Sequence, residues 1–210
     1  MEAFKFAFGK RSLLGDPAFN DQTEINELIA NLTSYDYASE IASKIKENVL
    51  SFEEYEPAFD IVENAGTAHI NVVDKDGMAC SITSTVNTIL GSKCIGTGTG
   101  IIYNNEMNDF SVPGHNNDYG VPPSPQNFIE AGKRPLSSMA PVIVTDKDGK
   151  LKLVAGGSGG TRITTATAQV VVKTLLQEMA LNEAVQDSRL HHQLMPDEIR
   201  IGTEKRINLD

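Results

Sequence analysis

Hydrophobic periodicity changes abruptly at Thr67, and this change determines the predicted fold class. Between residues 25 and 49, apolar residues recur at intervals of three and four, which is the spacing of a helix with one buried face. From Thr67 onward apolar and polar residues alternate, so that Ala68, Ile70 and Val72 share one face of a predicted strand. The chain is therefore predicted to be α+β, with helices preceding paired strands.

Two helices are predicted in the region before this change. One covers residues 25–32 and begins near Asp21 or Thr23, either of which can cap a helix N-terminus. The other covers residues 37–49. Residues 51–66 then lose the helical spacing and are acidic, so they are predicted to form an exposed loop.

Two β-hairpins are predicted, and both have the turn sequence Asp-Lys-Asp-Gly. The first turn is 74–77, and the second is 146–149, between strands at 141–145 and 151–155. The strands around the first turn carry threonine, serine and asparagine on one face. Short polar side chains on adjacent strands suggest the lining of a pocket, and an exposed threonine-rich strand face is the alternative.

A glycine run, Gly-Gly-Ser-Gly-Gly at 156–160, precedes a predicted helix. A phosphate loop is not favoured because the run contains no lysine and no Gly-Lys-Ser or Gly-Lys-Thr sequence. The backbone amides of Gly159 and Gly160 could instead form an oxyanion hole, or the glycines could simply permit tight turns. A shorter helix is predicted at 182–190, and the irregular stretch 95–138 is predicted to be a long loop.

Composition excludes several classes of function. The formal net charge of −10 argues against nonspecific binding of nucleic acid or anionic lipid, which requires clustered lysine and arginine. No apolar run approaches the roughly 20 residues of a membrane helix, and residues 1–10 do not resemble a secretory leader. Cys80 and Cys94 are predicted to be buried free thiols. The four histidines lack the spacing of metal ligands, so no metal site is predicted.

Thr67, in the sequence Gly-Thr-Ala-His, remains as a candidate nucleophile. A serine–histidine–aspartate enzyme is not favoured because 157–159 does not match the nucleophile-elbow motif. Threonine needs a base, and a free α-amino group with a pKa near 7.7–8.0 can serve at neutral pH. That amine exists only after the bond between Gly66 and Thr67 is cut, so the pattern favours self-cleavage at this position.

Six sequence blocks resemble the γ-glutamyltransferase (glutathione hydrolase) family in order and in separation. The blocks are Thr-Ala-His at 67–69, Thr-Ser-Thr-Val-Asn at 83–87, Gly-Ser-Lys at 91–93, Asn-Asn-Glu-Met-Asn-Asp-Phe at 104–110, Pro-Leu-Ser-Ser-Met at 135–139 and Gly-Gly-Thr at 159–161. The resemblance covers essentially the whole chain. It implies an N-terminal-nucleophile hydrolase, an αββα sandwich that is incomplete in this chain. Residues 1–66 would be the tail of a large subunit, and 67–210 a truncated small-subunit catalytic region.

The resemblance also implies roles for individual residues. Thr67 would be the nucleophile with its own amine as base, and Thr85 would assist processing or positioning. The α-amino group of a γ-glutamyl substrate would be held by oxygen-bearing side chains, which are Asn87, Glu106 and Asp109. Its α-carboxylate would be bound by two hydroxyls, those of Ser137 and Ser138. The oxyanion would be met by two backbone amides, those of Gly159 and Gly160.

The implied reaction is γ-glutamyl transfer and glutathione hydrolysis through an ester on Thr67. Glutathione or another γ-glutamyl compound would be the donor, and water, an amino acid or a dipeptide would be the acceptor. Neither a cofactor nor a metal is needed, since this acyl chemistry requires only a nucleophile, a base and oxyanion donors. The alternative is a noncatalytic, light-chain-like protein that acts only by pairing with another polypeptide.

The resemblance further predicts a partner and a location. A large subunit would complete the site, because the family's arginine for the substrate carboxylate does not lie in this chain. Without the family's closing segment after Asp210, sheet faces and edges are expected to be uncovered. The family's location implies the extracellular side of the plasma membrane, although no signal or anchor is expected within these residues. Asn31 lies in an N-glycosylation sequon, Asn-Leu-Thr.

Overall fold

The computed structural model describes residues 1–58, 66–116 and 122–202. The chain divides into two compact units, and each draws on both sides of the Gly66–Thr67 bond. The first unit comprises Met1–Val62, Met107–Ser137 and His192–Glu198, and the second comprises Glu63–Glu106, Ser138–His191 and Ile199–Asp210. The units therefore differ from the two pieces that cleavage would create, and the division at Gly66 stays a prediction.

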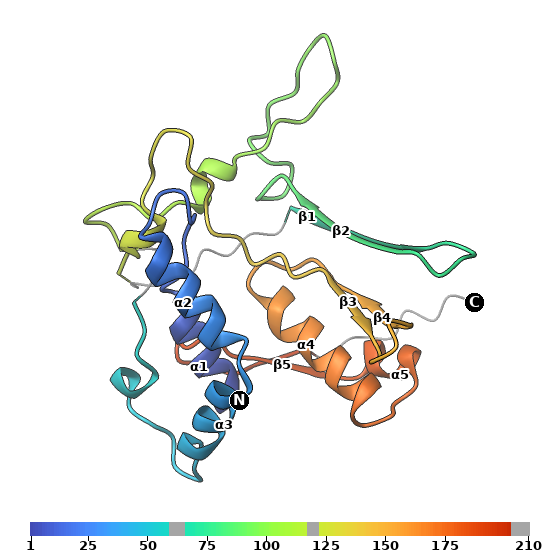
Figure 1. The fold of residues 1–210 in the computed structure, drawn as a ribbon. Coiled ribbons are helices and arrows are strands. Elements are labelled where there is room, and N and C mark those ends of the chain that lie inside the picture. The colour runs from blue at the N-terminus through green and yellow to red at the C-terminus, as the bar shows by residue number, and fades with distance from the viewer. Residues whose placement is uncertain (59–65, 117–121, 203–210) are drawn as a thin grey trace. The chain divides into compact units, whose positions relative to one another are not determined.

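The first unit is mainly helical (Figure 1). Its helices are α1 (Glu2–Arg11), α2 (Gln22–Leu32) and α3 (Tyr35–Lys44), with the short 3-10 turns η1 (Phe52–Tyr55) and η3 (Pro125–Asn127). Asp21 caps α2, because its side chain accepts hydrogen bonds from the backbone N–H groups of Thr23 and Glu24 at 2.9 and 3.1 Å. The predicted helices are confirmed, although α3 ends at Lys44.

Aromatic side chains form the core of the first unit. Phe6, Phe8, Tyr55 and Leu194 are each at most 5% exposed, and the rings of Phe6 and Tyr55 meet edge to face at 5.0 Å. The prediction of an exposed loop from residue 51 is therefore wrong at η1, since Tyr55 is buried there. Large aromatic rings bury enough apolar area to hold an acidic, irregular segment against the core. Residues 59–65 of that loop lie outside the described part.

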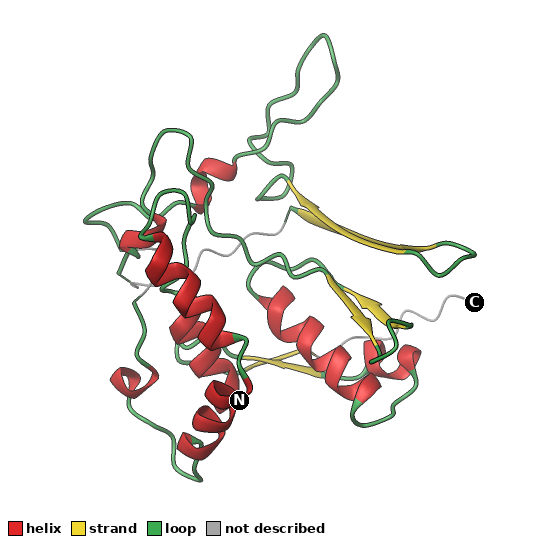
Figure 2. Ribbon diagram, viewed as in Figure 1, coloured by secondary structure: helices red, strands yellow, loops and turns green. Residues whose placement is uncertain are grey.

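The second unit contains the two predicted hairpins (Figure 2). Strand β1 (Thr67–Val73) pairs antiparallel with β2 (Ala79–Thr85), and β3 (Val142–Thr145) pairs with β4 (Leu151–Ala155). Helix α4 (Arg162–Leu175) follows the glycine run and packs on β4. The remaining elements are helix α5 (Leu181–Gln186) and the antiparallel pair β5 (Arg189–His191) and β6 (Arg200–Gly202).

The helix predicted at 182–190 is too long, because the chain turns into strand β5 after α5. His191 lies in β5, and its Nδ1 is 2.8 Å from Thr165 Oγ1 on α4. The side-chain oxygen of Gln169 also accepts the backbone N–H of Leu190 at 2.9 Å. Pairing with α4 and β6 therefore replaces the last helical turn that local spacing suggested.

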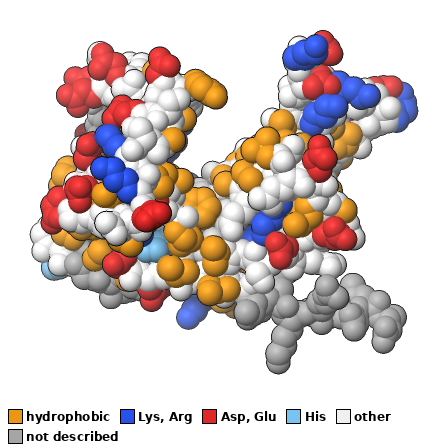
Figure 3. Space-filling view, turned by 90° about the horizontal axis from the view of Figure 1, so that it is seen from below, with side chains coloured by type: hydrophobic (Ala, Val, Ile, Leu, Met, Phe, Trp, Pro, Cys, Tyr) orange, Lys and Arg blue, Asp and Glu red, His pale blue; other side chains and the backbone are white. Residues whose placement is uncertain are grey.

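Both cysteines are free and exposed, which corrects the prediction of buried thiols. Cys80 pairs with Val72 across the β1–β2 hairpin, on the same face as Ile70 and Ile82. Those two isoleucines are 58% and 52% exposed, so this apolar face of the hairpin is uncovered. Exposed hydrophobic side chains are visible on the face of the molecule in Figure 3. An uncovered face of this kind is expected for the sheets, and the exposed isoleucines of this hairpin agree with that expectation.

Candidate active site

Thr67 and Thr85 lie directly opposite each other, at the first residue of β1 and the last residue of β2. The Thr67 hydroxyl donates to Thr85 Oγ1 at 3.0 Å, and the same oxygen accepts the backbone N–H of Asn87 at 2.9 Å. The structure therefore brings together the two threonines that the family resemblance paired. Because the backbone N–H of Asn87 fixes Thr85 Oγ1, that oxygen can orient the Thr67 hydroxyl.

The peptide bond before Thr67 is held in an extension of this hairpin. The carbonyl oxygen of Gly66 accepts the N–H of Val86 at 3.0 Å, and the N–H of Gly66 donates to Asn87 O at 2.6 Å. A side chain at Gly66 would not fit, since an added Cβ would stand 2.2 Å from Thr88 O. The bond predicted to be cut is thus fixed beside the candidate nucleophile.

Asn87 and Glu106 each have a buried side-chain oxygen without a hydrogen-bond donor among the described residues. Asn87 is fully buried, has a φ of +72°, and donates its amide to Asn105 O at 3.0 Å. The side chain of Asn105 in turn accepts the N–H and hydroxyl of Thr88 at 3.2 and 3.0 Å, so the two segments are tied together. Buried acceptors without donors are costly, and a bound ammonium group would supply the missing donors.

Gly159 and Gly160 form the turn that begins α4. Their φ values are +131° and +61°, a conformation that suits glycine. Their carbonyls accept the N–H groups of Arg162 and Ile163 at 3.3 and 3.1 Å, while their own N–H groups donate to no acceptor in the described ranges. The turn thus explains the glycines, and the free N–H groups additionally permit the predicted oxyanion role.

The polar face of the β1–β2 hairpin is a ladder of hydrogen-bonded cross-strand pairs. His69 contacts Thr83 Oγ1 through Nδ1 and Asn71 Oδ1 through Nε2, both at 2.9 Å. Ser81 donates to Asn71 Oδ1 at 2.9 Å and to Ala155 O on β4 at 3.3 Å. The ladder continues the Thr67–Thr85 pair along the strands. A structural role for His69 was missed from the sequence, although the alternation had placed it on the face of Thr67.

His69 also lies against the glycine run. A Cβ added at Gly156 would stand 2.1 Å from the Cε1 atom of the His69 ring. Glycine is therefore needed at this position for space, and no left-handed backbone is involved. The imidazole connects the strand that starts at Thr67 with the loop that carries Gly159 and Gly160.

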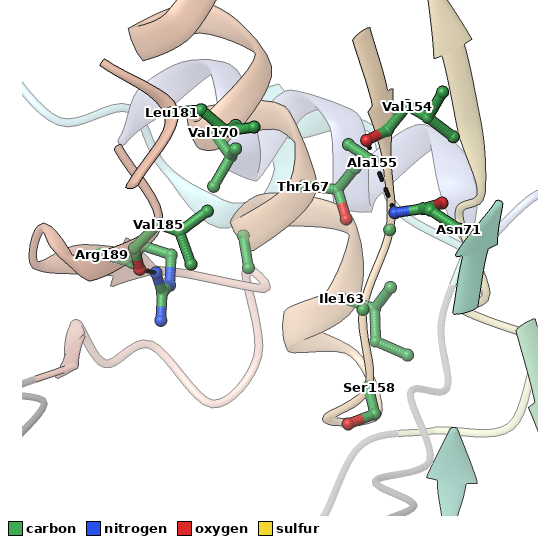
Figure 4. Close-up of a pocket in the computed structure, with 13 residues that line it drawn as sticks. Asn71, Val154, Ala155, Ser158, Ile163, Thr167, Val170, Leu181, Val185 and Arg189 are labelled. Atoms are coloured by element: carbon green, nitrogen blue, oxygen red, sulfur yellow. Dashed lines mark hydrogen bonds between the residues drawn. The ribbon is translucent and has the colours of Figure 1, made fainter. Parts of the chain in front are cut away.

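A pocket of about 330 Å³ lies beside this loop (Figure 4). Its lining comes from β4, the glycine run, α4 and α5, with Asn71 contributed by the hairpin and Arg189 by β5. Asn71 Nδ2 donates to Val154 O at 3.4 Å within this lining. The predicted pocket lining by the hairpin's polar face is thus limited to Asn71, since the other ladder side chains bond to one another or to β4.

The predicted substrate-binding residues are divided between the two units. Asn87, Glu106 and Ser138 belong to the second unit with Thr67, whereas Asp109 and Ser137 belong to the first. Asp109 and Ser138 are 3% and 6% exposed, so both are buried. The division falls within the short turn η2 (Glu106–Asp109) and again between the two serines. The structure groups only part of the predicted site within one unit.

Other features bear on cofactors and the membrane. Within residues 1–58, 66–116 and 122–202, no cluster of three or more histidine, cysteine, aspartate or glutamate side chains is arranged to hold a metal. None of the helices in these ranges is both long enough and apolar enough to cross a bilayer.

The family model for gamma-glutamyltranspeptidase matches residues 1–209 of the chain. The chain belongs to the γ-glutamyltranspeptidase family. Glutathione hydrolase proenzyme of Arthroderma benhamiae is 42% identical over 205 residues, which cover 93% of this chain and 34% of the relative. Glutathione hydrolase proenzyme 1 of Schizosaccharomyces pombe is 41% identical over 210 residues, covering 100% of this chain and 33% of the relative. The chain thus spans about a third of the length of these curated relatives.

Solved γ-glutamyltranspeptidases have a similar fold. A mutant of the Helicobacter pylori enzyme aligns with a TM-score of 0.59 and 47% identity, over 63% of this chain and 72% of that one. The Pseudomonas nitroreducens enzyme complexed with L-DON aligns with a TM-score of 0.58 and 47% identity, over 62% and 68%. The α+β fold predicted from the sequence, that of N-terminal-nucleophile hydrolases, is therefore confirmed and is present here in part.

Proposed function

We propose that this chain supplies the nucleophile and much of the donor site of an enzyme that transfers γ-glutamyl groups and hydrolyses glutathione. The observation that carries the proposal is the hydroxyl pair of Thr67 and Thr85, 3.0 Å apart, beside the fixed Gly66 carbonyl. Family membership and the glutathione hydrolases among the relatives give the substrate class. Amino-acid or dipeptide acceptors compete with water.

Maturation would begin with attack of Thr67 Oγ1 on the carbonyl carbon of Gly66. The C–N bond breaks, the nitrogen gains a proton, and an ester joins Gly66 to the threonine oxygen. Water then hydrolyses the ester, leaving a Gly66 carboxylate and a free Thr67 amine. The N–H of Val86, which already donates to the Gly66 oxygen at 3.0 Å, is placed to stabilise negative charge on that oxygen.

In the mature enzyme, the Thr67 amine would take the hydroxyl proton as Oγ1 attacks the donor's γ-carbonyl carbon. The amide bond breaks, and the proton passes to the leaving amine, which is cysteinylglycine when glutathione is the donor. The γ-glutamyl ester then passes to water or to the amino group of an acceptor. Backbone N–H groups of Gly159 and Gly160 would stabilise the oxyanion in both steps.

Recognition of the donor would use its two charged ends. Buried oxygens of Asn87 and Glu106, together with Asp109, would accept from the α-ammonium, and the hydroxyls of Ser137 and Ser138 would donate to the α-carboxylate. A large subunit would add further contacts, because charge-assisted pairs bind a carboxylate more strongly than hydroxyls alone. Such a partner accords with the third of the relatives' length that this chain spans.

The test is to incubate the purified chain, with a family large subunit added in a parallel sample. Mass spectrometry would look for a break between Gly66 and Thr67, and a γ-glutamyl anilide would report turnover. Thr67→Ala should abolish both, with turnover reduced by at least about a thousandfold. Thr67→Ser should retain part of the cleavage and part of the turnover. Thr23→Ala, at an exposed position, is the matched control. A covalent γ-glutamyl mimic that labels another residue would refute the assignment of Thr67.

A second candidate function is noncatalytic pairing with another polypeptide. It is favoured by the uncovered apolar face of the β1–β2 hairpin, where Ile70 is 58% exposed. An intact, unlabelled chain that nevertheless forms a stable heterodimer would support this function over catalysis.

We also propose, from the family's location, that the protein acts at the outer side of the plasma membrane and carries a glycan on Asn31. Asn31 is exposed near the end of α2, so its side chain is accessible for modification. Loss of mass on treatment with a peptide N-glycosidase, absent in Asn31→Gln, would support the modification. Surface labelling of intact cells would test the location.

A further inference from the structure

Asn127 holds two distant segments of the first unit through one side chain. Its Nδ2 donates to the carbonyl oxygen of Asp109 at 2.7 Å, and its Oδ1 accepts the backbone N–H of Leu136 at 2.9 Å. The residue is 6% exposed, so these bonds are protected from water. Both ends of one rigid carboxamide are therefore committed to backbone groups that lie 18 and 9 residues away.

The two segments carry residues proposed to bind opposite ends of the donor. Asp109, proposed for the α-ammonium, supplies the carbonyl that accepts from Asn127. Leu136, whose N–H is held, directly precedes Ser137, which is proposed for the α-carboxylate. Both ends of the Asn127 carboxamide are already hydrogen-bonded to backbone groups. Any effect of Asn127 on substrate binding would therefore act through Asp109 and Ser137.

Asn127 is itself fixed from several directions. Its carbonyl oxygen accepts the N–H of Ser111 at 3.0 Å, and its own N–H donates to Ser124 O at 3.1 Å. The hydroxyl of Ser124 donates to Ser12 O at 2.9 Å, which ties η3 to the end of α1. A side chain anchored in this way can hold the two segments that it joins at a fixed separation.

A second anchor holds the segment before Ser137. Arg134 donates to the Asp16 carboxylate from its backbone N at 2.9 Å, from Nε at 3.0 Å and from Nη2 at 2.9 Å. These bonds hold the pKa of the Asp16 carboxyl well below its usual range. Arg134 therefore fixes one end of the serine segment, and Asn127 fixes the point next to Ser137.

We propose that Asn127 is a positioning residue for donor recognition, because its carboxamide sets the separation between Asp109 and Ser137. The ligand class is an α-amino acid with its ammonium and carboxylate both free. The inference rests on the proposed γ-glutamyl function. A side chain at position 127 must both donate to Asp109 O and accept from the Leu136 N–H, so a group that can only donate or only accept could not hold both segments.

The test compares Asn127→Asp with the wild-type chain, with the large subunit present if turnover requires it. The substitution keeps an oxygen for the Leu136 N–H but loses the donor to Asp109 and sets a carboxylate oxygen against a carbonyl oxygen. Asn182→Asp, at an exposed position of α5, makes the same chemical change away from this region. Thermal melts of the three proteins report any general loss of folding.

Calorimetry would give dissociation constants for L-glutamate, for glutarate, which lacks the α-amino group, and for 4-aminobutyrate, which lacks the α-carboxylate. We expect Asn127→Asp to weaken L-glutamate binding by about 10- to 100-fold. That is the effect of losing one buried hydrogen bond, here between the ligand's ammonium and a displaced Asp109, and leaving its partner unpaired. Glutarate binding should change less than about threefold, since Asp109 has no ammonium to receive. The KM for a γ-glutamyl anilide should rise in parallel, with kcat changed less.

Two results would overturn the inference, and they differ from failure of the proposed function. Equal weakening of all three ligands, or weaker binding that follows lost thermal stability, would make Asn127 a purely structural residue. Unchanged binding in Asn127→Asp would remove the role entirely. If the wild-type chain binds no L-glutamate and no γ-glutamyl donor, the proposed function itself is refuted, and the inference with it.

Discussion

The β1–β2 and β3–β4 hairpins have the same turn but bury opposite kinds of face: the first turns its polar face inward, and the second its apolar face. In both, the first aspartate, Asp74 or Asp146, accepts with Oδ1 from the N–H groups two and four residues later. Those distances are 2.9 and 2.9 Å in the first hairpin and 3.0 and 2.9 Å in the second. The turn glycines, Gly77 and Gly149, have φ values of +85° and +79°.

The strands beyond these turns differ in which side chains they bury. In β3–β4, Leu153 and Ala155 are 5% and 8% exposed, so apolar groups face the core. In β1–β2, the hydroxyl, amide and imidazole ladder reaches β4 and Gly156, and Ile70 is exposed instead. A turn thus sets strand register, whereas the inward face is chosen by what the rest of the fold requires. The hairpin that leaves its apolar face exposed is the one that begins at the candidate nucleophile, Thr67.

The largest effect should come from truncating the inward apolar face. Leu153→Ala should lower the free energy of unfolding by about 2–5 kcal/mol, because it removes buried contacts and leaves a cavity. Ile70→Ala, on the exposed face of the other hairpin, should cost less than about 1 kcal/mol. Denaturant unfolding of both variants measures the difference. Similar losses would show that the β1–β2 apolar face is covered in solution.

The contact between His69 and Gly156 should give the next largest effect. Gly156→Ala would place a methyl group 2.1 Å from the ring, which hydrogen bonds to Thr83 and Asn71 hold in place. Overpacking of this kind should cost about 1–3 kcal/mol. Adding His69→Ala should recover part of that loss, so a double-mutant cycle of unfolding free energies should show coupling. Strictly additive losses would contradict the contact.

The shared turn makes a smaller, symmetrical prediction. Gly77→Ala and Gly149→Ala should each cost about 1 kcal/mol, since both glycines have positive φ and an added Cβ meets nothing within 4 Å. Urea unfolding of the two variants checks this. A clear difference between them would mean that the turns are not equivalent, despite their common hydrogen bonds.

Acid should destabilise the turn of β3–β4 by a still smaller amount. Hydrogen bonding to the N–H of Lys150, with help from Asp148 and Lys152, holds the pKa of the Asp146 carboxyl below its ordinary value. A lowered folded-state pKa stabilises the fold above the ordinary value of about 4, and that contribution disappears as pH falls through the lowered value.

Asp146→Asn should therefore melt below the wild type near neutral pH, and the gap should narrow toward about pH 2. Melting temperatures across this range provide the measurement. The exposed Asp148→Asn serves as the control for charge removal in the same turn. A gap that stays constant with pH would show that ionisation of Asp146 contributes nothing.

Features with local causes could be predicted from the sequence. The Asp21 cap, both Asp-Lys-Asp-Gly turns and the start of a strand at Thr67 depend on groups within a few residues of one another. The buried Tyr55, the exposed Cys80 and the end of α5 could not be predicted in this way. Each depends on partners elsewhere in the chain, as β5 does on its pairing with β6.

Residues of the candidate site also differ in whether the sequence could indicate them. Alternation placed Thr67 and His69 on one strand face, and the family resemblance named Thr85 and the oxygen-bearing substrate residues. Nothing in the sequence indicated Asn127, because its two partners are backbone groups across the irregular stretch 95–138. Side chains that bond to distant backbone leave no periodic pattern to detect.

The sequence by itself determined the order of helices and strands from α2 to α4, the two turns and the face on which each residue of the two hairpins lies, because these follow from local backbone geometry. Only the tertiary structure decided that the polar ladder turns inward, that His69 rests on Gly156 and that Asn127 joins Asp109 to Leu136. Burial and hydrogen-bond pairing depend on which distant groups meet, and a buried polar group is stable only when those partners are present.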